Sequence, residues 1–110
     1  MTDQVNFTTR TTFDIRHTFI IQDEDANAYD MNGSTFKCDF RTEAGATAAL
    51  ELTSGSGLTL GGTDNNQVEM VVEAGDLPEG TFKYEIIREN GSALELIAYG
   101  TVVVEEGITT

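Results

Sequence analysis

The stretch QDEDANAYDMNG concentrates the side chains of this sequence that are best suited to bind a cation. Asp23, Asp25 and Asn27 match the first, third and fifth ligand positions in the loop of a helix–loop–helix calcium site. The sixth position of that loop needs Gly and the twelfth needs a bidentate Glu, but Ala28 and Ser34 stand there. We therefore interpret the stretch as a polar turn between strands, in which Asx side chains bind backbone N–H groups. Calcium binding by the first three residues is the alternative.

The only histidine, His17, and the only cysteine, Cys38, are the other residues with chemical potential. A Cys–His nucleophile pair would need both, and a zinc site needs three or four N or S ligands. Cys38 alternates in phase with Phe36 and Phe40, which predicts a buried, unreactive thiol. His17 is in phase with apolar neighbours, so it is either a histidine at the edge of the core or the sign of a bulge. We expect no catalytic residue, no cofactor and no enzyme activity.

Nineteen Asp and Glu against six Lys and Arg give the chain a net charge of −13. This charge repels polyanions, so we expect neither a nucleic-acid partner nor an anionic membrane surface. Close carboxylate pairs such as Glu105-Glu106 are expected in solvent, where nothing raises a carboxyl pKa for general acid catalysis. We interpret the acidity as a source of solubility, with steering toward a basic partner as the functional alternative.

The elements that must position these residues are strands, because apolar side chains recur at every second position along most of the chain. Seven or eight short strands, separated by Gly, Asn and Asp clusters, predict one all-β domain over residues 1–110, an antiparallel β-sandwich or barrel. No apolar run is long enough for a membrane helix, and the polar N-terminus does not predict a secretory signal. The alternating sets are Phe13, Ile15, Phe19 and Ile21; Phe36, Cys38 and Phe40; Leu50 and Leu52; Leu58 and Leu60; Val68, Met70 and Val72; Phe82, Tyr84 and Ile86; Leu94, Leu96 and Ala98; Val102 and Val104.

Two connections can be predicted in more detail. Asn90-Gly91 can supply the two positive-φ residues of a type I′ turn, which would pair residues 82–88 with 93–99 as a hairpin. Gly75 and Pro78 limit residues 73–80 to a loop over one end of the sandwich, with Leu77 packed beneath it.

Several pieces of the chain, in order and at matching spacing, resemble small immunoglobulin-like structural proteins of tailed phages. The relevant family type is the N-terminal domain of baseplate upper and fibre-anchoring proteins. Ala26 and Ala28 depart from the Gly and Pro that are usual there. The matching pieces are RTTF (10–13), DEDANAYDMNG (23–33), FKCDFRT (36–42), NQVEMVVEAGDLPEGTFKYEI (66–86), ENGS (89–92) and GTVVVEEGIT (100–109).

The resemblance implies an immunoglobulin-like sandwich without catalytic residues, assembled in the bacterial cytoplasm into a virion. The protein would be an adaptor or assembly subunit in the tail, baseplate or fibre-attachment region, in contact with copies of itself and with other virion proteins. Residues 1–9 and 105–110 would be polar arms that reach neighbouring subunits. The alternatives are a capsid decoration protein and a calcium-dependent carbohydrate-binding module, for which DEDAN and TDNN would be the ligand loops.

Overall fold

The computed structural model describes residues 3–107, which form nine strands joined by turns and loops. The all-β prediction is confirmed. The strands are β1 (Asp3–Gln4), β2 (Phe7–Arg10), β3 (Ile15–Ile20), β4 (Thr35–Arg41), β5 (Leu50–Ser54), β6 (Gly57–Gly61), β7 (Gln67–Val72), β8 (Gly80–Asn90) and β9 (Ala93–Glu105).

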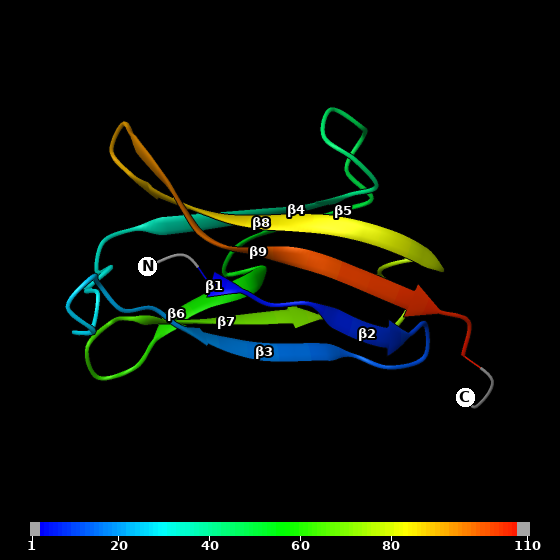
Figure 1. The fold of residues 1–110 in the computed structure, drawn as a ribbon, viewed down its shortest axis with the longest axis horizontal. Coiled ribbons are helices and arrows are strands. Elements are labelled where there is room, and N and C mark those ends of the chain that lie inside the picture. Colours follow the sequence, from blue (N-terminus) through cyan, green and yellow to red (C-terminus); the bar gives the residue numbers. More distant parts are fainter. Residues whose placement is uncertain (1–2, 108–110) are drawn as a thin grey trace.

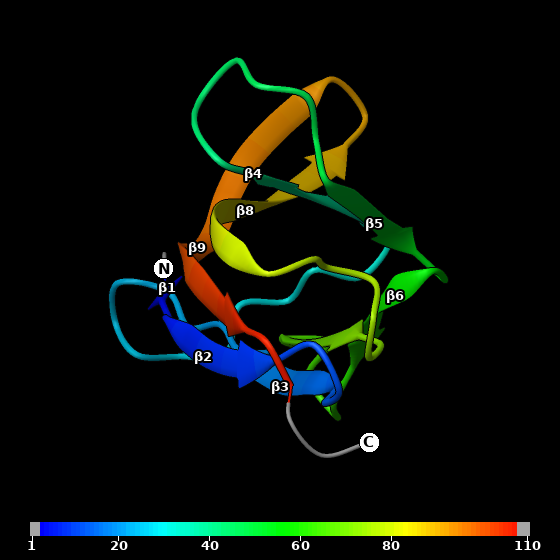
Figure 2. The same ribbon diagram turned by 90° about the vertical axis from the view of Figure 1, so that its right-hand side faces the viewer.

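All nine strands belong to one mixed sheet, in the order β1-β9-β8-β4-β5-β6-β7-β3, with β2 also paired to β9. Most pairs are antiparallel, as predicted, but β1 and β2 run parallel to β9, and β5 runs parallel to β6. The sheet folds over into two layers: β4, β5, β8 and β9 lie above β3, β6 and β7 in Figure 1. Seen from one end, the strands surround the core in a nearly closed ring (Figure 2).

The ring stays open between β2 and β3, and aromatic side chains bridge this gap. The His17 ring meets Phe7 of β2 edge-on at a centroid distance of 5.4 Å and Phe19 at 4.6 Å. The pairing of β3 with β7 runs without a register shift from Ile15 to Ile20. His17 is therefore a half-buried histidine at the edge of the core, and the alternative of a bulge at this position is wrong.

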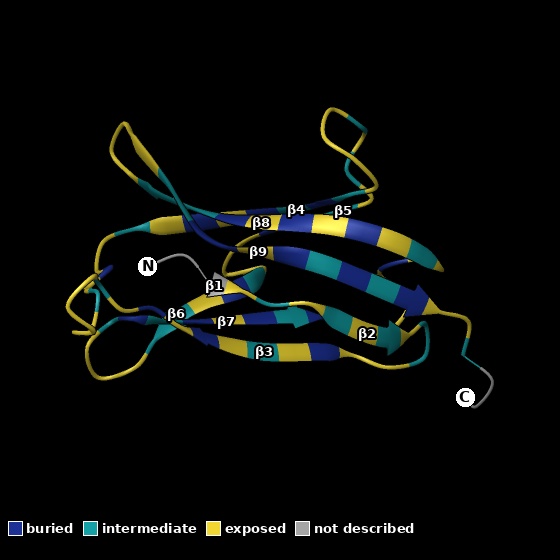
Figure 3. Cartoon of the chain, viewed as in Figure 1, coloured by how far each residue is buried: buried dark blue, intermediate teal, exposed yellow. Residues whose placement is uncertain are grey.

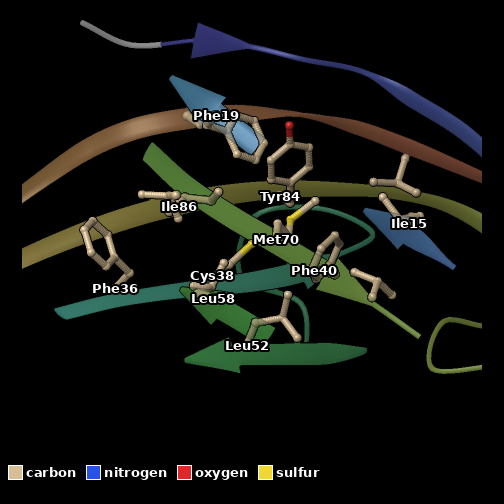
Figure 4. Packing of buried hydrophobic residues seen from close by; sticks show 14 of the residues in the cluster. Ile15, Phe19, Phe36, Cys38, Phe40, Leu52, Leu58, Met70, Tyr84 and Ile86 are labelled. Carbon is tan, nitrogen blue, oxygen red and sulfur yellow. The ribbon is translucent and has the colours of Figure 1, made fainter. Parts of the chain in front are cut away.

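The core lies between the two layers and takes its side chains from the predicted alternating sets. Figure 4 shows Tyr84, Met70 and Phe40 close together near its centre, with Cys38 of β4 alongside. Phe40 and Phe19 approach the Tyr84 ring at centroid distances of 5.6 and 6.4 Å. Cys38 is fully buried, as the alternation predicts. Inward and outward residues alternate along the strands in Figure 3.

Two apolar residues depart from the predicted pattern. Phe13 is 55% exposed, because its N–H donates to Arg10 O in a turn that ends before β3 begins. Leu94 is 66% exposed, because the pairing of β8 with β9 shifts register between Ile86 and Ile87. This bulge reverses the alternation along β9, so that Ile97 is buried and the phase predicted from Leu94 is wrong toward the tip.

The predicted β8–β9 hairpin is confirmed, but its turn lies one residue further along the chain. Asn90 pairs with Ala93, so the two loop residues are Gly91 and Ser92. Gly91 has a φ of 64° and Ser92 has no positive φ, which is the pattern of a type II′ rather than a type I′ turn. The predicted loop between β7 and β8 is also present, with Leu77 buried beneath it.

Residues that the sequence interpretation assigned to terminal arms lie largely in the sheet. From Asp3 onward the N-terminal segment forms β1 and β2 on β9, because β9 offers a free edge whose backbone groups need partners. The arm prediction is wrong for this segment. At the other end Glu105 closes β9, and Gly107 N donates to Thr11 Oγ1 at 3.0 Å. The rest of both predicted arms lies outside the described residues.

Gly100 of β9 and Tyr84 of β8 fix the bend between β1 and β2. The Tyr84 hydroxyl donates to Val5 O at 2.6 Å, and Val5 N donates to Tyr99 O at 3.0 Å. A Cβ atom at position 100 would lie 1.9 Å from Val5 O, so the bend passes over β9 only because this residue is glycine. The N-terminal strands are therefore held by a close backbone contact as well as by sheet pairing.

Candidate functional site

The candidate functional site is a groove of about 440 Å³ on the outer face of β4, β8 and β9. It extends from Gln4 of β1 to Ala44 in the β4–β5 connection. In Figure 1 this connection and the tip of the β8–β9 hairpin both rise above the upper layer, at its two ends. Tyr99, which is 37% exposed, and the half-buried Ile87 supply apolar surface. The outward residues of three strands thus line a hollow rather than a flat face.

Charged side chains cross the groove in two rows of opposite sign. Arg41 of β4 lies directly opposite Lys83 of β8, and one step along the strands Asp39 lies opposite Glu85. Tyr99 of β9 extends the acidic row, because it pairs with Glu85. Like charges directly opposite each other on neighbouring strands are unfavourable. The two rows therefore form a basic and an acidic bank at some expense of stability.

Ion pairs hold parts of this surface in place. Arg41 Nη2 lies 2.7 Å from Asp39 Oδ2, and Arg41 Nη1 donates to Ala46 O in the β4–β5 connection. Lys37 Nζ lies 3.1 Å from Glu89 Oε1. Lys83 has no ion-pair partner among residues 3–107. Arg41 thereby fixes one wall of the groove, while the Lys83 ammonium stays available to a partner.

The groove differs from the rest of the chain in its charge balance. Three of the six basic residues line it, together with three of the nineteen acidic residues. Its lining is therefore neutral, and the whole net charge of −13 lies elsewhere. An acidic group therefore meets less repulsion at this neutral lining than the net charge of the whole protein would impose.

The predicted cation-binding residues lie outside this groove, in the loop between β3 and β4. Asp23 Oδ1 accepts hydrogen bonds from Asp25 N at 2.9 Å and from Asn27 N at 3.0 Å, and Asp23 N donates to Asn27 O. Ala26 has a φ of 63°, within the same turn. The stretch is therefore the polar turn that the sequence predicts. Within residues 3–107 no group of three or more His, Cys, Asp or Glu side chains is placed to hold a metal ion.

The second Asx-rich segment, TDNN, also has a structural role. Asn66 is buried and its side-chain amide donates to Ile21 O at 3.2 Å. Asn65 O accepts from Met31 N at 2.9 Å. These bonds tie the β6–β7 loop to the β3–β4 loop at one end of the molecule. Neither predicted ligand loop adjoins the groove.

Sequence reasoning missed a charged cluster at the base of the β8–β9 hairpin. Arg88, whose side chain is largely buried, donates to Ser34 Oγ at 2.8 Å and lies 3.4 Å from Glu95 Oε1. The Tyr29 hydroxyl donates to the same Glu95 oxygen at 2.9 Å, and the Arg88 guanidinium lies over the Tyr29 ring. The cluster joins the β3–β4 loop to the hairpin. No local sequence pattern predicts this cluster, because its members come from distant parts of the chain: Tyr29 and Glu95 are 66 residues apart.

Replacing Glu95 with glutamine is expected to lower the pKa of Tyr29 toward its ordinary value of 10.0. In the native protein the hydrogen bond to Glu95, burial and the Glu95 charge raise this pKa, against the opposing effect of Arg88. The neutral amide would remove the charge and weaken the bond. Titration of the tyrosine ring carbons by NMR measures the shift. Glu89→Gln, on the same hairpin, is the control, and an unchanged Tyr29 pKa in Glu95→Gln would contradict the assignment.

Fold and site together define a small all-β protein with a nearly barrel-shaped mixed sheet and a charge-patterned groove on its outer face. No protein-family model matches the sequence. A search of curated proteins finds no match either. None of residues 3–107 forms a helix long and apolar enough to cross a membrane.

Proposed function

We propose that this chain is a non-enzymatic structural protein of a tailed-phage virion. It acts as an adaptor or assembly subunit in the tail, baseplate or fibre-attachment region, and binds other virion proteins and copies of itself. The observation that carries the proposal is the groove. A hollow with a basic bank beside an acidic bank, on an otherwise strongly acidic protein, is a surface suited to a protein partner rather than to a small substrate.

We also propose that the nearly closed sheet is an immunoglobulin-like sandwich. The pairing of β3 with β7 and of β7 with β6 supports this assignment, because it matches strands B, E and D of that fold. The neighbouring strands β4, β8 and β9 correspond to C, F and G, and β5 to the additional strand beside C in variable-type domains. The short parallel contact of β5 with β6 then joins the two sheets along one side.

The ordered resemblance to tailed-phage proteins adds the cellular context. Its longest piece, NQVEMVVEAGDLPEGTFKYEI, covers β7, the loop over Leu77 and the first half of β8. The same piece supplies Lys83 and Glu85, one residue of each bank. Strand β8 therefore belongs both to the segment that carries the resemblance and to the groove.

Immunogold labelling of particles from the source, with an antibody to this chain, tests the proposed function. Gold at the tail, the baseplate or the fibres is the expected result. Gold spread over the head would assign the chain to capsid decoration instead. Particles without gold, from cells in which the antibody detects the chain by immunoblot, would refute a virion role.

A further inference from the structure

We propose that the groove binds an extended polypeptide segment of a partner protein, in which acidic and basic residues alternate. This inference deepens the proposed function and rests on it for the presence of a protein partner. It starts from the two charged rows. Arg41 and Lys83 form the basic bank, and Asp39 and Glu85 form the acidic bank directly beside it.

The shape of the face selects a narrow occupant. The β4–β5 connection and the β8–β9 hairpin rise at the two ends of the outer face (Figure 1). The same face of a second copy would be held away from the groove floor by these projections. An extended segment that crosses the strands between the two projections reaches the floor. It would follow the rows, since each row runs across β4 and β8.

The charge pattern selects the sequence of that segment. Side chains of an extended chain point alternately to opposite sides. In a segment lying between the rows, one set of side chains meets Arg41 and Lys83, and the other meets Asp39 and Glu85. Acidic residues on the first side and basic residues on the second satisfy both banks. Tyr99, at the end of the acidic row, offers its exposed ring to one of the basic residues.

The unpaired Lys83 is the strongest single attraction in the groove. Arg41 already forms an ion pair with Asp39, whereas Lys83 has none among residues 3–107. Lys83 also lies at a position where its nearest cross-strand neighbour, Arg41, repels it. An acidic side chain of the partner placed between the two cations would relieve that repulsion. A surface on which each cation already faces an anion has no such repulsion to relieve.

The test titrates the isotope-labelled chain with two end-blocked synthetic peptides of about ten residues, enough to span the groove. One alternates Glu and Lys; the other has the same composition in two blocks, all Glu and then all Lys. Strict alternation places like charges four residues apart, which disfavours a helix. We expect the alternating peptide to shift the NMR signals of residues 83–85 and 99–101, and to bind about tenfold more tightly than the block peptide at low salt.

Charge-reversal variants make the test specific. Lys83→Glu is expected to lower the affinity for the alternating peptide about tenfold and to raise the affinity for oligolysine. In this variant the basic bank becomes neutral and the other bank stays acidic. Glu85→Lys is expected to gain binding of oligoglutamate for the converse reason. The matched controls on the other layer are Arg16→Glu on β3 and Glu69→Lys on β7, which change the net charge equally and lie outside the groove. Thermal melts establish that each variant is folded.

Equal affinity for the two peptides, no shift at about 1 mM peptide, or the same loss in the control variants would each overturn the assignment. Concentration-dependent shifts of the same residues without peptide would make a second copy the occupant, and would also overturn it. These outcomes are independent of the particle labelling. Gold on the tail with no peptide binding would leave the virion role in place and remove only this groove assignment. Peptide binding with no gold on the particles would leave the groove assignment in place and remove the virion role.

Discussion

Gly100→Ala is expected to lower the free energy of unfolding by about 3 kcal/mol and to release β1 and β2 from β9. The added Cβ atom would lie 1.9 Å from the carbonyl oxygen of Val5 and 2.8 Å from its carbonyl carbon. Both are backbone atoms, so no side-chain rotation relieves the overlap. Moving Val5 away also breaks the hydrogen bond that its carbonyl oxygen accepts from the Tyr84 hydroxyl at 2.6 Å.

Thermal unfolding and amide hydrogen exchange measure the two parts of this prediction. The melting temperature should fall by roughly 12 °C, and the amides of residues 7–10 should exchange faster than those of β4. Gly61→Ala in β6 is the matched control, because a Cβ atom there has no neighbour within 4 Å and the residue has no positive φ. Similar melting temperatures for Gly100→Ala and Gly61→Ala would show that the overlap with Val5 does not destabilise the protein.

The stability of the protein is expected to fall steeply above pH 9 through ionisation of Cys38. Burial is the main cause that raises the pKa of this thiol well above its ordinary value of 9.0, and the nearby Asp39 charge adds to it. Below pH 9 the thiol keeps its proton in both the folded and the unfolded state. Above pH 9 only the unfolded state loses it, so the unfolded state is favoured by about 1.4 kcal/mol for each further pH unit.

Urea unfolding of the reduced protein between pH 7 and pH 11 measures this effect. Between pH 9 and pH 11 ionisation of the thiol should lower the free energy of unfolding of the wild type by about 2.7 kcal/mol. This contribution should be missing in Cys38→Val. Tyr29, whose pKa is raised mainly by its hydrogen bond to Glu95, contributes in the same direction above pH 10. Tyr29→Phe separates the two contributions. Parallel curves for wild type and Cys38→Val would mean that the thiol ionises without unfolding.

The strands could be predicted from the sequence because burial on one face imposes a period of two. That rule placed Cys38 in the core, and the structure confirms it. The rule fails where the backbone itself changes phase. The bulge beside Ile86 is one such place, and the exposed Leu94 is its consequence. A bulge adds one residue to one strand, and no composition of side chains requires it.

The candidate site could not be predicted, because it depends on which strands are neighbours. Arg41 and Lys83 are distant in sequence, and only the pairing of β4 with β8 makes them a row. The same holds for the bond between Tyr84 and Val5, which joins the two halves of the chain. The acidic stretches that stand out in the sequence are local ones, such as residues 23–25. In the structure Asp23 uses its carboxylate to close a turn.

The parallel pairing of β1 and β2 with β9 has a consequence for synthesis. The ribosome makes β2 long before β9, so the edge that receives Phe7–Arg10 exists only after β9 has left the exit tunnel. Until then the N-terminal segment has no partner strand, and His17 lacks the Phe7 ring against its side. Closure of this side of the sheet therefore waits for the synthesis of β9, and any fusion that holds β9 back delays it.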